Sequence, residues 1–209
     1  PSYHGYDVTD YRMVNPDYGT NEDFFDLMAA AHERGIAVIV DLVVNHTSSD
    51  HPWFVASASG DAEYADWYRW DEECPTYRGP WGQQVWIPRG DRCYYAVFWE
   101  GIPDLNYETP AVMTEMTAIA QFWVQEMGAD GFRLDGLKHV IEEGAEQENT
   151  ASTLAWAAEF HDAVQNAAPD SLTVGEVWSS NFTASQYVPE AADLVFEFDL
   201  ATAMVQSAR

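Results

Sequence analysis

The chain has 209 residues, of which 47% are hydrophobic, so it can bury one sizeable core and does not have the composition of a disordered chain. Its 35 acidic residues against 9 basic ones give a formal net charge of -26, which disfavours nucleic acid and anionic membranes as partners. No stretch approaches the roughly 18 consecutive apolar residues of a membrane-spanning helix.

The first predicted elements are a helix and a buried strand. Thr20 and Asp23 predict an N-cap and a capping box for an amphipathic helix that Gly35 closes. The continuous apolar run 36–44 that follows is typical of a strand buried on both faces.

The segment 47–110 then interrupts this pattern. It is rich in Trp, Tyr, Pro, Gly and Asp, and it is too long for a simple connection between a strand and a helix. We expect an inserted subdomain here, which divides the chain into 1–46, 47–110 and 111–209. Its tryptophans either line a groove for a sugar or form the small core of the insert: Trp67, Trp70, Trp81, Trp86 and Trp99.

Strands and helices alternate again after the insert. Short strands are expected at 131–135, 172–176 and 194–199, and helices over about 111–127 and 152–167 precede the first two. Alternation of this kind predicts an α/β fold with a parallel sheet.

Ionisable side chains occur where each predicted strand ends. They are Asp41 with His46, Arg133 with Asp135, Glu176, and Glu197 with Asp199. Active sites of parallel barrels are assembled from these strand ends. One such acidic residue is more often a helix cap or an ion-pair partner, but four strand ends in succession predict an active site.

Asp135 and Glu176 are the strongest candidates for catalysis. If their strands are neighbours, the backbones lie about 4.8 Å apart, and the carboxyls can approach the roughly 5–5.5 Å separation of a retaining glycosidase. Arg133 points to the same side of its strand as Asp135 and favours the ionised form of a nucleophile. Apolar neighbours and the second carboxylate favour a protonated Glu176, as a general acid requires.

Five segments, 4–7, 41–46, 102–106, 131–139 and 175–178, resemble motifs of the α-amylase family of glycoside hydrolases, in the family's order. The resemblance covers nearly the whole chain. It implies a (β/α)8 TIM barrel, of which the chain holds about strands 3 to 6, with an inserted loop-rich subdomain after strand 3.

The resemblance also implies which residues act. Asp135 is expected to be the nucleophile, with Arg133 as its partner, and Glu176 the acid/base, in a retaining hydrolase that cleaves α-1,4-glucan such as starch or maltodextrin. Tyr6 is expected to stack on the sugar at the cleavage point, and His46 to hydrogen-bond it. Lys138 is expected to contact sugar beyond that point. The matched segments place three further residues around the substrate: His4, Asp41 and His139.

A calcium site is a further implication. Asn45, Asp104 and the backbone carbonyl of His139 match positions that bind structural Ca²⁺ in many amylases, and all are oxygen ligands, as Ca²⁺ prefers. A hydrogen-bond network without metal is the alternative.

Other functions within and outside the family stay open. The segments 6–11 and 51–54 favour a trehalose synthase or an oligo-1,6-glucosidase, whereas Lys138 and His139 favour an α-amylase. A non-catalytic carbohydrate-binding relative is the third possibility, although such proteins usually lack the catalytic carboxylates.

The chain is expected to be a piece of a longer protein. It begins at Pro1 without a methionine, and the family's fourth motif, with a third catalytic aspartate, is not found. Expressed alone, these residues are expected to be inactive and to aggregate, because an open arc exposes sheet edges. Cellular location is not predicted.

Two features of the composition allow two interpretations each. Cys74 and Cys93 either form a disulfide or remain free thiols. The acidic composition, with Lys138 as the single lysine, suits a halophilic protein or an ordinary acidic enzyme from a GC-rich genome.

Overall fold

A four-stranded parallel sheet forms the centre of the chain in the computed structural model, which describes residues 2–208. Its strands lie in the order β1-β5-β6-β7. They are β1 (Val40–Val43), β5 (Gly131–Asp135), β6 (Leu172–Gly175) and β7 (Leu194–Val195). The predicted parallel α/β sheet is therefore confirmed, with the strands of Asp135 and Glu176 side by side.

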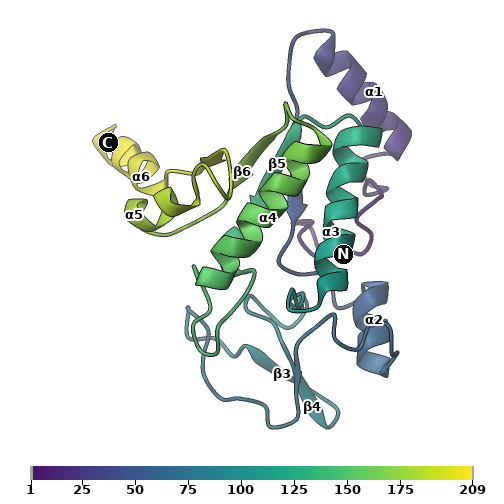
Figure 1. Cartoon of the computed structure of the whole chain (residues 1–209), viewed down its shortest axis with the longest axis vertical. Helices are drawn as coiled ribbons and strands as arrows, with labels where there is room; N and C mark the ends of the chain where they lie inside the picture. The colour runs from purple at the N-terminus through teal and green to yellow at the C-terminus, as the bar shows by residue number, and fades with distance from the viewer. Residues whose placement is uncertain (1, 209) are drawn as a thin grey trace.

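Three long helices accompany the sheet: α1 (Asn21–His32), α3 (Pro110–Gln121) and α4 (Ala151–Ala167). The capping box predicted for α1 is present, because Thr20 and Asp23 exchange side-chain and backbone hydrogen bonds. One π-helical turn, η1 (Phe122–Glu126), extends α3. Figure 1 shows α3 and α4 side by side along β5, with α1 at one end of the sheet.

Alternation along β5 separates the core from the site. Phe132 and Leu134 are fully buried in the main hydrophobic cluster, which also contains Met116 of α3 and Phe160 of α4. Successive side chains of a strand point to opposite faces, so Arg133 and Asp135 point away from these helices. Burial of β5 against α3 and α4 thereby fixes the direction of the two polar side chains.

The first predicted strand is shorter than the apolar run 36–44 indicated. Only Val40–Val43 pair with β5, and Ile36 and Ile39 are exposed. Val38 instead bonds Asp130, its N–H to Oδ2 (2.6 Å) and its carbonyl to the Asp130 N–H (2.9 Å). In this register residues 36–38 precede Gly131, the first residue of β5, so they have no residue of that strand opposite them.

The prediction of a strand over 194–199 was also wrong in its second half. The chain leaves β7 after Val195 and enters helix α6 (Phe198–Ser207). Glu197 caps this helix, since its side chain accepts from the Leu200 N–H (3.0 Å), and Asp199 lies in the first turn. These two carboxylates therefore lie at the N-terminus of α6 and are not at the end of a strand.

The segment 47–110 carries helix α2 (Pro52–Ser59) and a separate antiparallel sheet in the order β2-β4-β3. The strands are β2 (Trp70–Asp71), β3 (Trp86–Arg89) and β4 (Arg92–Tyr95). Figure 1 shows β3 and β4 beyond the end of the main sheet. Cys74 and Cys93 are joined by a disulfide with a Cα–Cα distance of 5.3 Å, which resolves the open question about these thiols.

Short helical turns complete the chain: η2 (Leu137–His139), α5 (Asn181–Ala184) and η3 (Ser185–Tyr187). Within residues 2–208, none of the helices has the length and apolar character needed to cross a membrane.

Candidate active site

Arg133 lies at the centre of a cluster of three carboxylates. Its Nη1 contacts Asp41 Oδ1 at 2.7 Å and Asp135 Oδ1 at 2.6 Å, and its Nη2 contacts Glu176 Oε2 at 2.8 Å. One guanidinium thus links Asp41 within β1, Asp135 at the end of β5 and Glu176 directly after β6. The sequence had paired this arginine with Asp135 alone, and its contact with Glu176 is a correction.

The strand register explains this convergence. Asp41 lies opposite Arg133 in the parallel pair β1–β5, so both side chains share one face of the sheet. Arg133 lies opposite Val174 of β6, and continuing that register by two residues brings Glu176 beside Asp135. The hydrogen bond from Glu176 N–H to the Leu134 carbonyl (3.0 Å) extends the ladder to this point.

Asp135 is 8% exposed, and its charge is set by competition between burial and Arg133. Burial raises the pKa of Asp135, Arg133 lowers it, and the nearby carboxylates Glu176 and Asp41 raise it again, which together give a pKa of about 6. The sequence predicted that the arginine would dominate. Desolvation outweighs it, although Asp135 remains mostly ionised near pH 7.

Glu176 follows β6 and is half-buried above Arg133. Its Oε2 accepts a hydrogen bond from the Gly136 N–H at 3.3 Å. Gly136 has φ +59, and a Cβ there would lie 3.2 Å from the Phe98 ring, so glycine suits this left-handed turn. The turn after β5 therefore helps to orient the carboxylate that follows β6.

Tyr6 and His4 form one side of the site. The Tyr6 hydroxyl donates to Asp41 Oδ2 at 3.3 Å, and Arg133 lies over the ring at 5.6 Å from its centroid. The ring of His4 stacks on Tyr6, with centroids 5.8 Å apart. Asp41 does not line the pocket described below; its carboxylate contacts the Arg133 guanidinium and the Tyr6 hydroxyl.

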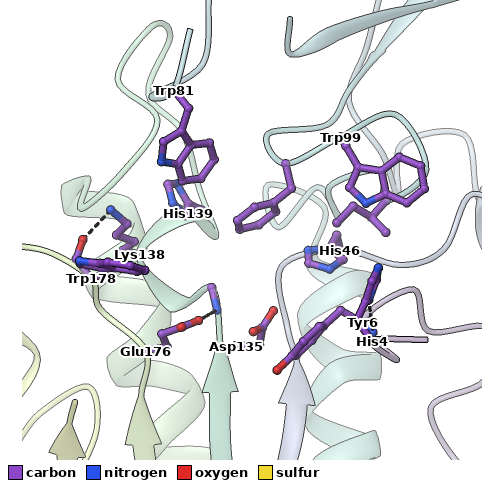
Figure 2. A pocket seen from close by; sticks show the side chains of 13 residues that line it. His4, Tyr6, His46, Trp81, Trp99, Asp135, Lys138, His139, Glu176 and Trp178 are labelled. Carbon is purple, nitrogen blue, oxygen red and sulfur yellow. Dashed lines mark hydrogen bonds between the residues drawn. The ribbon is translucent and has the colours of Figure 1, made fainter. Parts of the chain in front are cut away.

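A pocket of about 410 Å³ opens above these groups. Figure 2 shows Asp135 and Glu176 at its base, with Tyr6 facing Asp135 from the other side. His46 also lines it; burial lowers the pKa of His46 to about 3, so the ring is neutral. His46 Nε2 is buried, and the Tyr6 backbone lies close enough to the ring to oppose this lowering of the pKa.

Aromatic side chains form the upper walls of the pocket (Figure 2). Trp81 is 61% exposed and Trp99 is 47% exposed, whereas Trp67 is buried in the main hydrophobic cluster, Trp70 packs against that cluster, and Trp86 is buried in the smaller cluster of the insert. Trp81 and Trp99 thus line the pocket, whereas the other three tryptophans pack in or against hydrophobic cores. Trp178, 69% exposed, forms the wall nearest Glu176.

Lys138 and His139 both line the pocket, and both have protein partners. Lys138 Nζ contacts Glu148 Oε2 at 2.6 Å and donates to the Trp178 carbonyl at 2.8 Å. The His139 ring is buried against Trp81 and Phe98, and its Nδ1 lies 2.9 Å from the Gln147 carbonyl.

The predicted calcium ligands Asn45 and Asp104 are neighbours, since the adjacent residue His46 forms a bridge with Asp104. Both are buried, and Asn45 Oδ1 and Asp104 Oδ2 each lack a hydrogen-bond partner. Burial and the nearby Glu142 raise the pKa of Asp104 well above its ordinary value. Two orphaned oxygens in a buried acidic environment fit a hard cation such as Ca²⁺. No cluster of three His, Cys, Asp or Glu side chains suited to a metal occurs between residues 2 and 208.

Sequence reasoning missed four residues that line the pocket: Phe98, Ile102, Gly136 and Trp178. Each had a signal in the sequence. Phe98 precedes a candidate tryptophan. Ile102, Gly136 and Trp178 lie in segments already matched to motifs. Only their positions in space show that they face the same cavity as Asp135.

Carboxylates that share an arginine at the carboxyl end of a parallel α/β sheet, beneath a pocket with aromatic walls, are the arrangement expected of a barrel of the glycoside hydrolase class. The family follows from comparison with known proteins. Residues 1–209 match the family model described as the alpha amylase catalytic domain, so the chain belongs to the alpha-amylase family.

The relatives confirm this family and the barrel fold. Alpha-amylase 3 of Dictyoglomus thermophilum is 45% identical over 187 residues, which are 89% of this chain and 35% of that protein. A trehalose synthase/amylase of Mycolicibacterium smegmatis is 36% identical over 194 residues, 86% of this chain and 32% of that protein. The crystal structure of an alpha-amylase from H. orenii matches with a TM-score of 0.87 at 42% identity, covering 100% of this chain and 42% of that one. The chain is therefore part of a (β/α)8 barrel and spans about a third of the curated relatives' length.

Proposed function

We propose that the chain carries the nucleophile Asp135 and the general acid/base Glu176 of a retaining enzyme that cleaves α-1,4-glucosidic bonds of starch or maltodextrins. The observation that carries this proposal is the Arg133 cluster. It joins both carboxylates at the base of a pocket large enough for a sugar, at the strand ends where barrel enzymes act.

In the first step, an Asp135 oxygen attacks the anomeric carbon while the bond from that carbon to the glycosidic oxygen breaks. Glu176 gives its proton to the departing oxygen. Arg133 keeps Asp135 mostly ionised despite burial. The product of this step is a glucosyl ester of Asp135.

In the second step, Glu176 takes a proton from water, and the water oxygen displaces Asp135 from the anomeric carbon. Both carboxylates return to their starting states, and the anomeric configuration is retained. The neutral His46 would hydrogen-bond the sugar and Tyr6 would stack on it, and both line the pocket, so both would bind without adding charge to the site.

Product analysis of the full-length protein tests the proposal. Incubation with starch and with maltose should yield shorter maltodextrins and glucose, and Asp135→Asn and Glu176→Gln should each reduce turnover by at least about 10³-fold. Asp170→Asn is the control, because it also replaces one carboxylate by an amide but at an exposed position. Undiminished turnover in either catalytic variant would contradict the assigned roles.

A trehalose synthase is the second candidate, because relatives at 36% and 37% identity carry that name. Both reactions begin with the same glucosyl ester and differ in the acceptor, which is water in one and glucose in the other. Trehalose as the main product from maltose would favour this candidate over the amylase.

We further propose that Asn45, Asp104 and the His139 carbonyl bind Ca²⁺. The orphaned oxygens of Asn45 and Asp104 support this proposal. A bound Ca²⁺ would neutralise Asp104 and join the loop after β1 to the insert, which makes its role structural.

A further inference from the structure

The Lys138 ammonium forms an ion pair with Glu148 and a hydrogen bond to the backbone of Trp178. The ammonium contacts Glu148 Oε2 at 2.6 Å and donates to the Trp178 carbonyl at 2.8 Å, and the lysine side chain is only 12% exposed. Two of the three ammonium donors are thus committed within the protein. This arrangement differs from the direct sugar contact that the resemblance implied.

The loop 143–149 strengthens the same connection. The Asn149 N–H donates to the Lys138 carbonyl at 2.7 Å, and Asn149 Nδ2 donates to Ser179 Oγ at 3.1 Å, directly after Trp178. At its other side, Gln147 Nε2 donates to the Arg78 carbonyl in the insert at 2.9 Å. The loop therefore links η2, the insert and the segment that follows β6.

Trp178 presents an aromatic face to the pocket next to Glu176. Its ring stacks on Phe198 with centroids 5.0 Å apart and planes at 14°, which supports it from behind. Figure 2 shows the ring on the Glu176 side, opposite Tyr6. A general acid must face the leaving oxygen, so Trp178 lies on the side of the sugar that departs.

We propose that Lys138 and Glu148 are positioning residues that hold Trp178 as the binding wall for the leaving or accepting sugar. The inference rests on the proposed function. An aromatic ring binds the apolar face of a sugar only when its plane is fixed at the right height, and here one hydrogen bond to the Trp178 carbonyl and one to the Ser179 hydroxyl fix it. Selectivity for the acceptor side would then depend on an ion pair that does not touch the sugar.

Two substrates separate this role from catalysis in the full-length protein. A maltodextrin has a sugar on the Trp178 side, whereas α-glucosyl fluoride leaves only fluoride there. Glu148→Gln and Trp178→Ala should each raise KM for maltodextrin about three- to tenfold, the range of one aromatic contact. The kcat/KM of Glu148→Gln for α-glucosyl fluoride should change less than about twofold. Glu146→Gln, exposed on the same loop, is the matched control and should change neither value.

A double variant distinguishes positioning from direct contact. If Lys138 acts through Trp178, Lys138→Met combined with Trp178→Ala should be no worse than Trp178→Ala alone. Provided that the wild-type protein turns over α-glucosyl fluoride normally, two results would overturn the inference. One is an additive increase of the maltodextrin KM in the double variant, and the other is an unchanged or lower maltodextrin KM in Glu148→Gln. A wild-type protein that turns over neither substrate would instead overturn the proposed function, and this inference with it.

Discussion

The acid limb of the pH profile provides a direct test of how Asp135 is buried. The nucleophile must be ionised, and the structure places its pKa at about 6 because desolvation exceeds the attraction of Arg133. Activity should therefore be full above this value and fall as pH decreases through it. At pH 5, kcat/KM should be about one tenth of its plateau, since each pH unit below the pKa reduces the ionised fraction about tenfold.

The assay is kcat/KM for α-glucosyl fluoride between about pH 4 and pH 8, which reports the free enzyme. Asp41→Asn should move the limb to lower pH, because Asp41 is one of the negative charges that raise the pKa of Asp135. The exposed Asp170→Asn makes the same change in net charge and should leave the limb in place. A plateau that extends to about pH 4, the ordinary range of an aspartate, would refute the reasoning.

Three further predictions concern stability, each measured by thermal or denaturant unfolding. Cys74→Ser should lower the free energy of unfolding by about 3 kcal/mol, because the disulfide closes a loop between residues 19 apart, and reductant should then have no further effect. At a Ca²⁺ concentration one hundred times Kd, adding EDTA should lower the free energy of unfolding by about 2.7 kcal/mol. Asp104→Asn should abolish this effect of EDTA, and a melting temperature that EDTA leaves unchanged in the wild-type protein would contradict the calcium proposal. Gly131→Ala should lower the free energy of unfolding by roughly 2–6 kcal/mol, because its Cβ would lie 1.9 Å from the Leu172 carbonyl oxygen and φ is +145. Gly128→Ala, at φ +78 in open space, should cost only roughly 1–2 kcal/mol, and equal losses would show that the contact with β6 is unimportant.

The sequence by itself predicted the features that depend on local pattern. Alternation of apolar runs predicted the parallel sheet, and the capping box predicted the start of α1, because these signals lie within a few residues. It also indicated that Arg133 and Asp135 share one face of their strand, since that follows from the period of a strand. Its two strand errors, at 36–39 and 196–199, occurred where pairing with a distant strand or a helix cap decides the conformation.

Tertiary structure decided the features that depend on distance and burial. Only the register between β5 and β6 brings Arg133 to Glu176 as well as to Asp135, and only burial makes the pKa of Asp135 high despite the arginine. The partners of Lys138 come from a loop and a strand end that no spacing relates to it. Residue types and periods are encoded locally, whereas desolvation and contacts between distant segments exist only once the chain has folded.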